Sequence, residues 1–188
     1  MDSMISYVAF LRGINVGGHK LIKMEDLARV FVSAGFKNVR TLIASGNVIF
    51  EARETERDVL ARKIEKKLTK AFGHEITVVI MTIAQLKAAV RRHPFKDLEA
   101  SRDIMLFVTF LASEPVRKPK VPLKVEKESI ELLAIRDRVV FILARRKENG
   151  WFGFPHAFAE RLFGTLTTTR NLSTVQRILK AAEPQAKK

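Results

Sequence analysis

The order of apolar segments in the first half of the chain is the feature that most constrains its fold. Short apolar runs, typical of strands, alternate with longer stretches whose apolar residues recur at helical spacing. The strand-like runs are 5–11, 39–44, 48–50 and 76–81, with helical stretches after the first and the third. This order of strand, helix, strand, strand, helix, strand predicts a ferredoxin-like, split βαβ unit. Such a unit has a mostly antiparallel sheet with helices on one face.

Residues at the expected helix ends agree with this prediction. Gly35 and Gly73 follow the two helical stretches, as glycines that close helices do. Thr55 is expected to cap the second helix, and Thr82 with Gln85 has the spacing of a capping box for a third helix. The first and fourth strands are apolar on both faces. We therefore expect the second face of the sheet to be covered too, most simply by the other half of the chain.

The second half repeats the pattern in a looser form. A strong apolar strand at 103–112 is followed by a connector with three prolines, which excludes a long regular helix there. The runs 129–135 and 139–144 predict a hairpin. One helix is expected around 156–163, and a final helix follows the segment TLTTTRN. The order of elements echoes the first half, and no convincing residue repeat is evident.

The length of the chain fits one compact domain or two small ones. Its 188 residues, 47% of them hydrophobic, can bury a substantial core. We predict an α+β fold with a ferredoxin-like unit over residues 1–95 and a second, degenerate α+β unit over residues 96–188. The second unit packs against the first or is intertwined with it in one domain.

Several classes of site are excluded by composition. The absence of cysteine rules out a disulfide scaffold, a thiolate zinc site and a cysteine nucleophile. The four histidines form no metal set, because Val78 stands where a zinc motif starting at His74-Glu75 needs its second histidine. We expect no metal and no cofactor. The N-terminus is typical of a strand and not of a signal peptide, and no stretch is apolar enough to span a membrane, so the expectation is a cytoplasmic protein without a membrane partner.

The net charge of +14, from 34 Lys and Arg against 20 Asp and Glu, attracts polyanions. The basic residues are spread along the chain, with dense runs at 62–70 and 116–124. The first run alternates with apolar positions at helical spacing, which favours a solvated helix face. Tyr7 and Phe50 are the only obvious aromatic candidates for stacking RNA bases. Strands that are apolar on both faces argue against an open stacking platform, so nucleic acid would bind by backbone electrostatics.

The segment FLRGINVGGHK (10–20) is the first candidate for a binding loop. Its glycine spacing matches neither the dinucleotide fingerprint nor a Walker loop. Glycines after a strand still let backbone N–H groups converge on an anion, and Arg12 or Lys20 can supply charge. The alternative is a turn in which the glycines satisfy unusual dihedral angles and Asn15 bonds its own backbone.

Two further segments have the same ambiguity. Ser45-Gly46-Asn47 is typical of a hairpin turn, and its side chains can join a site if the turn lies near the first loop. Thr167–Asn171 directly precedes a helix, and hydroxyls with an arginine at a helix N-terminus suit an anion. The alternative is ordinary capping by Asn171 or Ser173, which leaves Arg170 unexplained.

Together these segments carry a family resemblance. Phe10–Gly18, then Met24 and Leu27, then Ser45–Phe50, then Thr168–Asn171 with Thr174 and Val175, resemble the bacterial domain of unknown function 1697 family. The combination in this order spans nearly the whole chain. The resemblance implies an α+β fold built around ferredoxin-like units, and it implies no established activity.

The first hypothesis is that the three segments converge on one polar pocket that binds a phosphate-bearing small molecule or nucleotide. Its expected residues are Arg12, Gly13, Asn15, Gly17, Gly18, Lys20, Ser45, Asn47, Thr169, Arg170 and Asn171. One alternative is a non-catalytic nucleic-acid-binding protein that acts through its basic surface. Another is a structural or interaction module without a ligand. The sequence leaves open whether the protein is an enzyme and whether it forms oligomers.

Overall fold

The computed structural model describes residues 3–16, 21–96, 98–153 and 155–183, and the chain divides into two compact units. Unit 1 comprises Met1–Lys87 with Arg177–Lys188, and unit 2 comprises Ala88–Gln176. The boundaries fall inside two helices, α3 (Ile83–Arg91) and α5 (Leu172–Ala182). Within the described ranges, no helix has both the length and the apolar character needed to cross a membrane.

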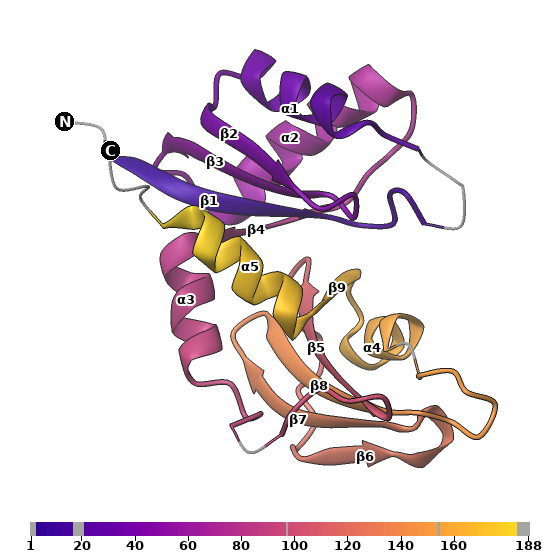
Figure 1. The fold of residues 1–188 in the computed structure, drawn as a ribbon. Coiled ribbons are helices and arrows are strands. Elements are labelled where there is room, and N and C mark those ends of the chain that lie inside the picture. Colours follow the sequence, from indigo (N-terminus) through magenta and orange to yellow (C-terminus); the bar gives the residue numbers. More distant parts are fainter. Residues whose placement is uncertain (1–2, 17–20, 97, 154, 184–188) are drawn as a thin grey trace. The chain divides into compact units, whose positions relative to one another are not determined.

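Unit 1 has the predicted ferredoxin-like architecture (Figure 1). Its elements are β1 (Met4–Leu11), α1 (Met24–Ser33), β2 (Lys37–Leu42), β3 (Asn47–Arg53), α2 (Arg57–Phe72) and β4 (Val78–Thr82). The sheet order is β2-β3-β1-β4, and every pairing is antiparallel. Both α1 and α2 cover the same face of this sheet (Figure 1). The prediction of an α+β fold is therefore confirmed.

The core of unit 1 forms around β1, whose residues Tyr7–Leu11 are all at most 1% exposed. Alternate residues of this strand point to opposite faces, so both faces are buried at β1, as its apolar sequence predicts. On the helix-covered face the Tyr7 ring stacks on Phe50 at a centroid distance of 5.6 Å, and Phe31 meets the edge of Phe50. Tyr7 and Phe50 are thus core residues and offer no platform for RNA bases.

The predicted helix caps had mixed outcomes. The capping box at the start of α3 is confirmed, because the Gln85 N–H donates to Thr82 Oγ1 and the Thr82 N–H donates to Gln85 Oε1, both at 3.0 Å. The expected Thr55 cap of α2 is wrong. The Thr55 hydroxyl instead donates to the Arg53 carbonyl at 2.9 Å. The Tyr7 hydroxyl donates to the Thr55 carbonyl and accepts from the Thr55 N–H. These two bonds hold Thr55 outside α2, where its side chain does not cap the helix.

Unit 2 contains a second antiparallel sheet. Its elements are β5 (Ile104–Leu111), β6 (Leu123–Val125), β7 (Ile130–Arg136), β8 (Val139–Arg145), α4 (His156–Phe163) and β9 (Thr167–Asn171), with a short 3₁₀ turn, η1, at Glu126–Glu128. The sheet order is β6-β7-β8-β5-β9. The predicted β7–β8 hairpin and the helix at 156–163 are confirmed. Gly164 ends α4 in the left-handed conformation, as Gly73 ends α2.

Without the edge strand β6, the order β7-β8-β5-β9 reproduces the order β2-β3-β1-β4 of unit 1. The central strands correspond residue by residue, with YVAFL at Tyr7–Leu11 and FVTFL at Phe107–Leu111. Their partners also match, because Met4 pairs with Arg53 and Ile104 pairs with Arg145. The structure thus reveals a residue correspondence that is too short to be evident in the sequence alone.

The strand β9 was not predicted. The sequence TTTRN lacks apolar residues, so it looks like a polar connector before the last helix. Threonine is β-branched and suits a strand, and the segment pairs along β5, with Thr109 opposite Thr169. Like β4 before α3, β9 runs directly into a helix, since α5 begins at Leu172.

His93, in the segment after α3, gives unit 2 a testable pH dependence. The Phe95 N–H donates to His93 Nδ1 at 3.1 Å, which requires the neutral ring. Burial, followed by the charges of Lys96 and Arg136, lowers the pKa of His93 below 6.5. The unfolded chain therefore binds more protons, and stability declines as the pH falls below about 6.5 toward the folded-state pKa.

We expect the difference in unfolding free energy between wild type and His93→Asn to shrink between pH 8 and pH 5, because an Asn oxygen still accepts from Phe95 and does not titrate. Urea denaturation across this range, followed by circular dichroism, measures the difference. A difference that is constant with pH contradicts the assignment.

Candidate functional site

The first predicted segment leaves β1 as a tight turn in unit 1. The Arg12 N–H donates to the Thr77 carbonyl at 2.9 Å, so the chain is still paired with the approach to β4 as the strand ends. Gly13 then adopts φ +65° with no atom within 4 Å of where a Cβ would lie. Asn15 is also left-handed, with φ 54°. Gly17, Gly18 and Lys20 lie outside the described residues.

The side chain of Asn15 holds this turn closed. Its Oδ1 accepts from the Ile22 N–H at 2.7 Å, and its Nδ2 donates to the Ile22 carbonyl at 3.0 Å. The same Nδ2 donates to the Ala44 carbonyl in the β2–β3 turn at 2.7 Å. These three bonds engage both polar atoms of the amide, and their partners are backbone groups of Ile22 and Ala44, not the Asn15 backbone that the turn alternative expected.

The second predicted segment lies against the first. The Leu11 N–H donates to the Gly46 carbonyl at 2.8 Å. Gly46 has φ +77°, and a Cβ on it would lie 2.6 Å from Ile14 Cδ1. Asn47 is fully buried and donates from Nδ2 to the Leu42 carbonyl at 2.9 Å. The structure therefore brings the first two segments together in a packed corner, where the hairpin turn closes on the end of β1.

The third predicted segment belongs to unit 2. Arg170 is 9% exposed, and its guanidinium donates to Thr168 Oγ1 at 2.8 Å and to the Thr169 carbonyl at 2.9 Å. Burial lowers the pKa of Arg170 to about 10, so it stays charged at neutral pH. Thr169 bonds the Thr109 hydroxyl at 2.8 Å on the opposite face of the sheet, and Asn171 is exposed.

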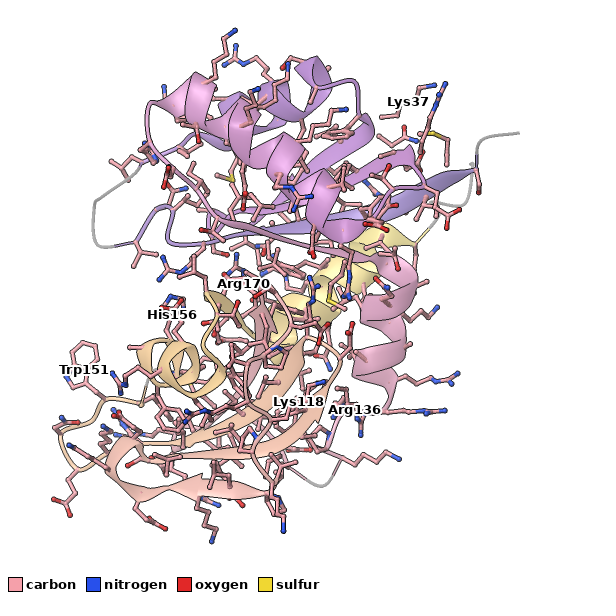
Figure 2. The ribbon with its side chains drawn as sticks, turned by 180° about the vertical axis from the view of Figure 1, so that it is seen from behind. Lys37, Lys118, Arg136, Trp151, His156 and Arg170 are labelled. Atoms are coloured by element: carbon pink, nitrogen blue, oxygen red, sulfur yellow. The ribbon has the colours of Figure 1, made fainter. Side chains whose placement is uncertain are left out.

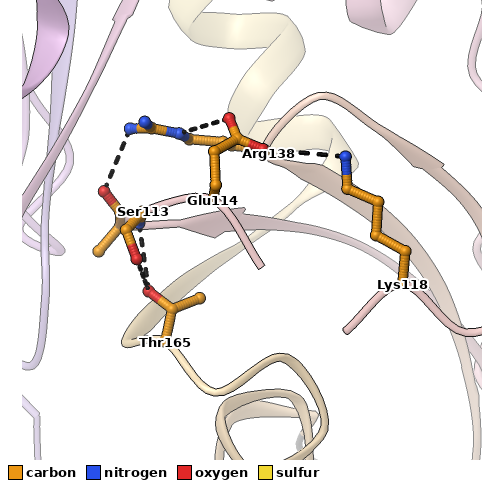
Figure 3. Close-up of polar contacts among 6 residues, drawn as sticks. Ser113, Glu114, Lys118, Arg138 and Thr165 are labelled. Atoms are coloured by element: carbon orange, nitrogen blue, oxygen red, sulfur yellow. Dashed lines mark hydrogen bonds and ion pairs between the residues drawn. The ribbon is translucent and has the colours of Figure 1, made fainter. Parts of the chain in front are cut away.

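The corner of unit 1 has an equivalent in unit 2. The Leu111 N–H donates to the Arg138 carbonyl at 2.9 Å, as Leu11 donates to Gly46. Figure 3 shows Glu114 between Arg138, at 3.1 Å, and Lys118, at 3.8 Å. This recurrence indicates that the corner is a requirement of the fold, because each central strand needs its last N–H groups paired.

A contact that the sequence did not reveal links α4 to β9. His156, labelled in Figure 2, lies 3.3 Å from the Thr167 hydroxyl through Nδ1 and 3.5 Å from Glu160 Oε1 through Nε2. The arrangement of hydroxyl, imidazole and carboxylate is that of a catalytic triad. Thr167 is fully buried, however, and the Glu160 oxygen also accepts its backbone N–H at 2.9 Å. The contact therefore fixes α4 to the sheet edge.

A cleft in unit 1 lies elsewhere, beside the start of α2. It has a volume of about 580 Å³. Three cations line it, Lys37 from β2, Arg53 from the end of β3 and Lys63 from α2, and Lys37 lies at an outer edge of the unit (Figure 2). Among the described residues of its lining, none is acidic. The cleft therefore has a positive rim built from three separate elements.

An apolar wall lies beside these cations. Met4 and Val59, which are 44% and 46% exposed, line the cleft together with Phe36. Lys63 Nζ lies 5.0 Å from the centroid of the Phe36 ring, a cation–π contact that positions the ammonium over the wall. Within the described part of the chain, no group of three or more His, Asp or Glu is placed to hold a metal. The cleft thus suits an anion with an apolar body.

Comparison with known proteins bears on the fold and the family. A family model described as a protein of unknown function, DUF1697, matches residues 4–141. The chain belongs to the DUF1697 family. The matched range includes the corner formed by Arg12–Asn15 and Ser45–Asn47 and ends before Thr168–Asn171. The family resemblance in the sequence is therefore confirmed.

A solved structure supports the DUF1697 fold. The conserved bacterial protein SP0830 from Streptococcus pneumoniae is similar with a TM-score of 0.69 and 19% sequence identity. The match covers 96% of this chain and 100% of that one. At this identity the likeness concerns the fold alone. Among curated proteins, none matches the sequence significantly.

Because the Asn15 amide holds the corner together, we expect Asn15→Ala to destabilise the protein by about 2 kcal/mol or more. The substitution removes three hydrogen bonds, and alanine is disfavoured at positive φ. Urea unfolding measures the loss. An unfolding free energy within 0.5 kcal/mol of wild type, taken as roughly the effect of a neutral surface change, contradicts a structural role.

Two glycines of the corner provide a matched pair. Gly13→Ala and Gly46→Ala both place a Cβ at positive φ, but only the second drives it into Ile14. We expect Gly13→Ala to cost about 1 kcal/mol and Gly46→Ala distinctly more, as overpacking adds roughly 1–3 kcal/mol. Equal losses in thermal or urea unfolding would mean that the turn does not pack as described.

Proposed function

We propose that this DUF1697 protein binds a phosphate-bearing small molecule with an apolar or aromatic body, such as a nucleotide, in the cleft beside α2. The observation that carries the proposal is the convergence of Lys37, Arg53 and Lys63 on one concave surface with an apolar wall. A volume of about 580 Å³ is within the range of small-molecule sites, which is roughly 300–1,000 Å³.

The chemistry of the lining favours this ligand class. Three cations on separate elements can surround a phosphate, and charge-assisted hydrogen bonds to phosphate oxygens are stronger than neutral ones. Met4, Phe36 and Val59 offer apolar surface beside the cations to an apolar group. An anion without such a group leaves this wall in water, so the two surfaces together favour an organic phosphate over inorganic phosphate.

The hypothesis from the sequence placed the same class of ligand among Arg12–Lys20, Ser45–Asn47 and Thr168–Asn171. It stays a prediction. The side chains of Asn15 and Asn47 are engaged in backbone hydrogen bonds, which favours the cleft as the first place to look. If the cleft binds no organic phosphate, three alternatives from the sequence remain: a ligand among these segments, a non-catalytic nucleic-acid-binding protein that acts through its basic surface, and a structural or interaction module without a ligand.

Calorimetric titration at low ionic strength tests the proposal with adenosine monophosphate. We expect measurable binding of adenosine monophosphate. Adenosine and inorganic phosphate should each bind at least about tenfold more weakly, because adenosine can contact only the apolar wall and inorganic phosphate only the cations. Lys63→Ala and Lys37→Ala should each weaken binding about tenfold, the usual effect of losing one charged contact.

Lys87→Ala is the control, since Lys87 is an exposed lysine of unit 1 that does not line the cleft. Its affinity should equal that of wild type. Val59→Asp places a negative charge on the apolar wall at a half-exposed position and should abolish binding without lowering the melting temperature. Equal affinity of Lys63→Ala and Lys87→Ala contradicts the proposal.

A further inference from the structure

Lys63 belongs to two features of unit 1, the cleft and a row of cations on α2. The row consists of Arg62, Lys63, Lys66, Lys67 and Lys70, all of them exposed. At 3.6 residues per turn these positions fall within about 140° of the helix circumference and span about 12 Å along its axis. The cleft therefore opens at one end of a continuous cationic surface.

The opposite side of α2 explains why this row faces outward. Leu60, Ile64 and Leu68 are buried against the sheet, so the remaining positions must face solvent. Between Arg62 and Lys70 the single acidic residue is Glu65. Its carboxylate accepts from the Val78 N–H at 2.8 Å, which directs it toward β4. Glu65 and Glu75 line a separate hollow beside Arg62 and Lys66, so the positive charge of the row is least offset at Lys63, Lys67 and Lys70.

A solvated amphipathic helix accounts for exposed lysines, but it does not account for their continuity with a cleft that suits a nucleotide. We propose that the ligand of unit 1 is a single-stranded nucleic acid, with one terminal nucleotide in the cleft and the adjacent phosphates along α2. This inference rests on the proposed function, because the cleft must accept the nucleotide.

The dimensions fit a short strand. Successive nucleotides advance about 3.4 Å along one strand of a stacked duplex and farther along an unstacked strand, so about 12 Å of α2 accommodates at most roughly three phosphates. The bases of a duplex are paired and stacked, and the cleft accepts only a nucleotide that is free to leave the stack. The structure therefore favours a single-stranded end over a duplex and over a polyanion that lacks bases.

The test is a length series of 5′-phosphorylated oligodeoxyadenylates, from the mononucleotide to the hexanucleotide, measured by calorimetric titration. We expect affinity to rise at least about tenfold from one to four nucleotides and then to level off. The slope of log K against log salt should approach about −2.8 for the tetranucleotide, from about −0.7 for each of its four phosphates. A blunt-ended duplex long enough to stay paired and inorganic polyphosphate should each bind more weakly than the tetranucleotide.

Variants of the row separate this inference from the proposed function. The triple substitution Lys66→Ala, Lys67→Ala, Lys70→Ala should remove the gain with length while mononucleotide affinity changes less than twofold. If mononucleotide binds and affinity does not rise with length, the inference is overturned and the proposed function stands. If mononucleotide does not bind at all, the proposed function fails, and the inference with it.

The chain's single tryptophan provides a further control. Trp151, in unit 2, is 76% exposed, so a base can stack on its ring. Trp151→Ala should leave the tetranucleotide affinity unchanged. A loss of about tenfold or more in this variant, with the triple lysine variant unaffected, places the strand elsewhere and overturns the inference.

Discussion

The rest of the structure depends on pairing every backbone group of one inner strand in each sheet, β1 in unit 1 and β5 in unit 2. Both faces of β1 and of β5 are buried, and both strands are paired on two sides. No backbone group of such a strand can reach water, so the neighbours must continue pairing until the strand ends. This accounts for the hydrogen bonds from Leu11 to Gly46 and from Leu111 to Arg138. The turn after β1 is thus explained by backbone chemistry before any ligand is considered.

The two units pair the last N–H groups of these strands with different residues. In unit 1 the left-handed residues Gly13, Asn15 and Gly46 let the turn and the hairpin pack together, and the Asn15 amide joins them. In unit 2 a two-residue β7–β8 turn containing Asp137 is used, and Arg138 and Glu114 supply an ion pair at the surface. The same topology therefore tolerates different corner chemistry, provided that the last N–H groups are paired.

The connection after β1 and β5 differs between the two units. In unit 1 it contains α1, and the turn from α1 into β2 supplies Phe36 and Lys37 to the cleft. In unit 2 the corresponding residues, 112–122, contain no helix within the described part of the chain, and the short strand β6 follows. The cleft thus depends on a piece of the fold that one half of the pseudo-repeat has and the other lacks.

Much of the fold was predictable because it follows from local patterns. The apolar runs, the Thr82–Gln85 box and the glycines at helix ends are signals within a few residues of each other. Strand β9 was not predicted because its β-branched residues are polar. Thr55 does not cap α2 because a residue distant in sequence, Tyr7, binds its backbone groups. The cleft was missed for a related reason, since its cations come from three separate elements. The spacing of Val59 and Lys63, four residues apart on a helix, was the one local sign that two lining residues share a face.

A chemical-shift map tests most directly whether the corner of unit 1 is structural and the cleft binds the ligand. ¹⁵N-labelled protein is titrated with adenosine monophosphate, and the amides that move are assigned. We expect the largest shifts at the amides of Lys37, Arg53, Val59 and Lys63. The shifts of Gly13, Asn15 and Gly46 should be small. Largest shifts at Gly13, Asn15 and Gly46, with the cleft unaffected, would show that the corner is the binding site.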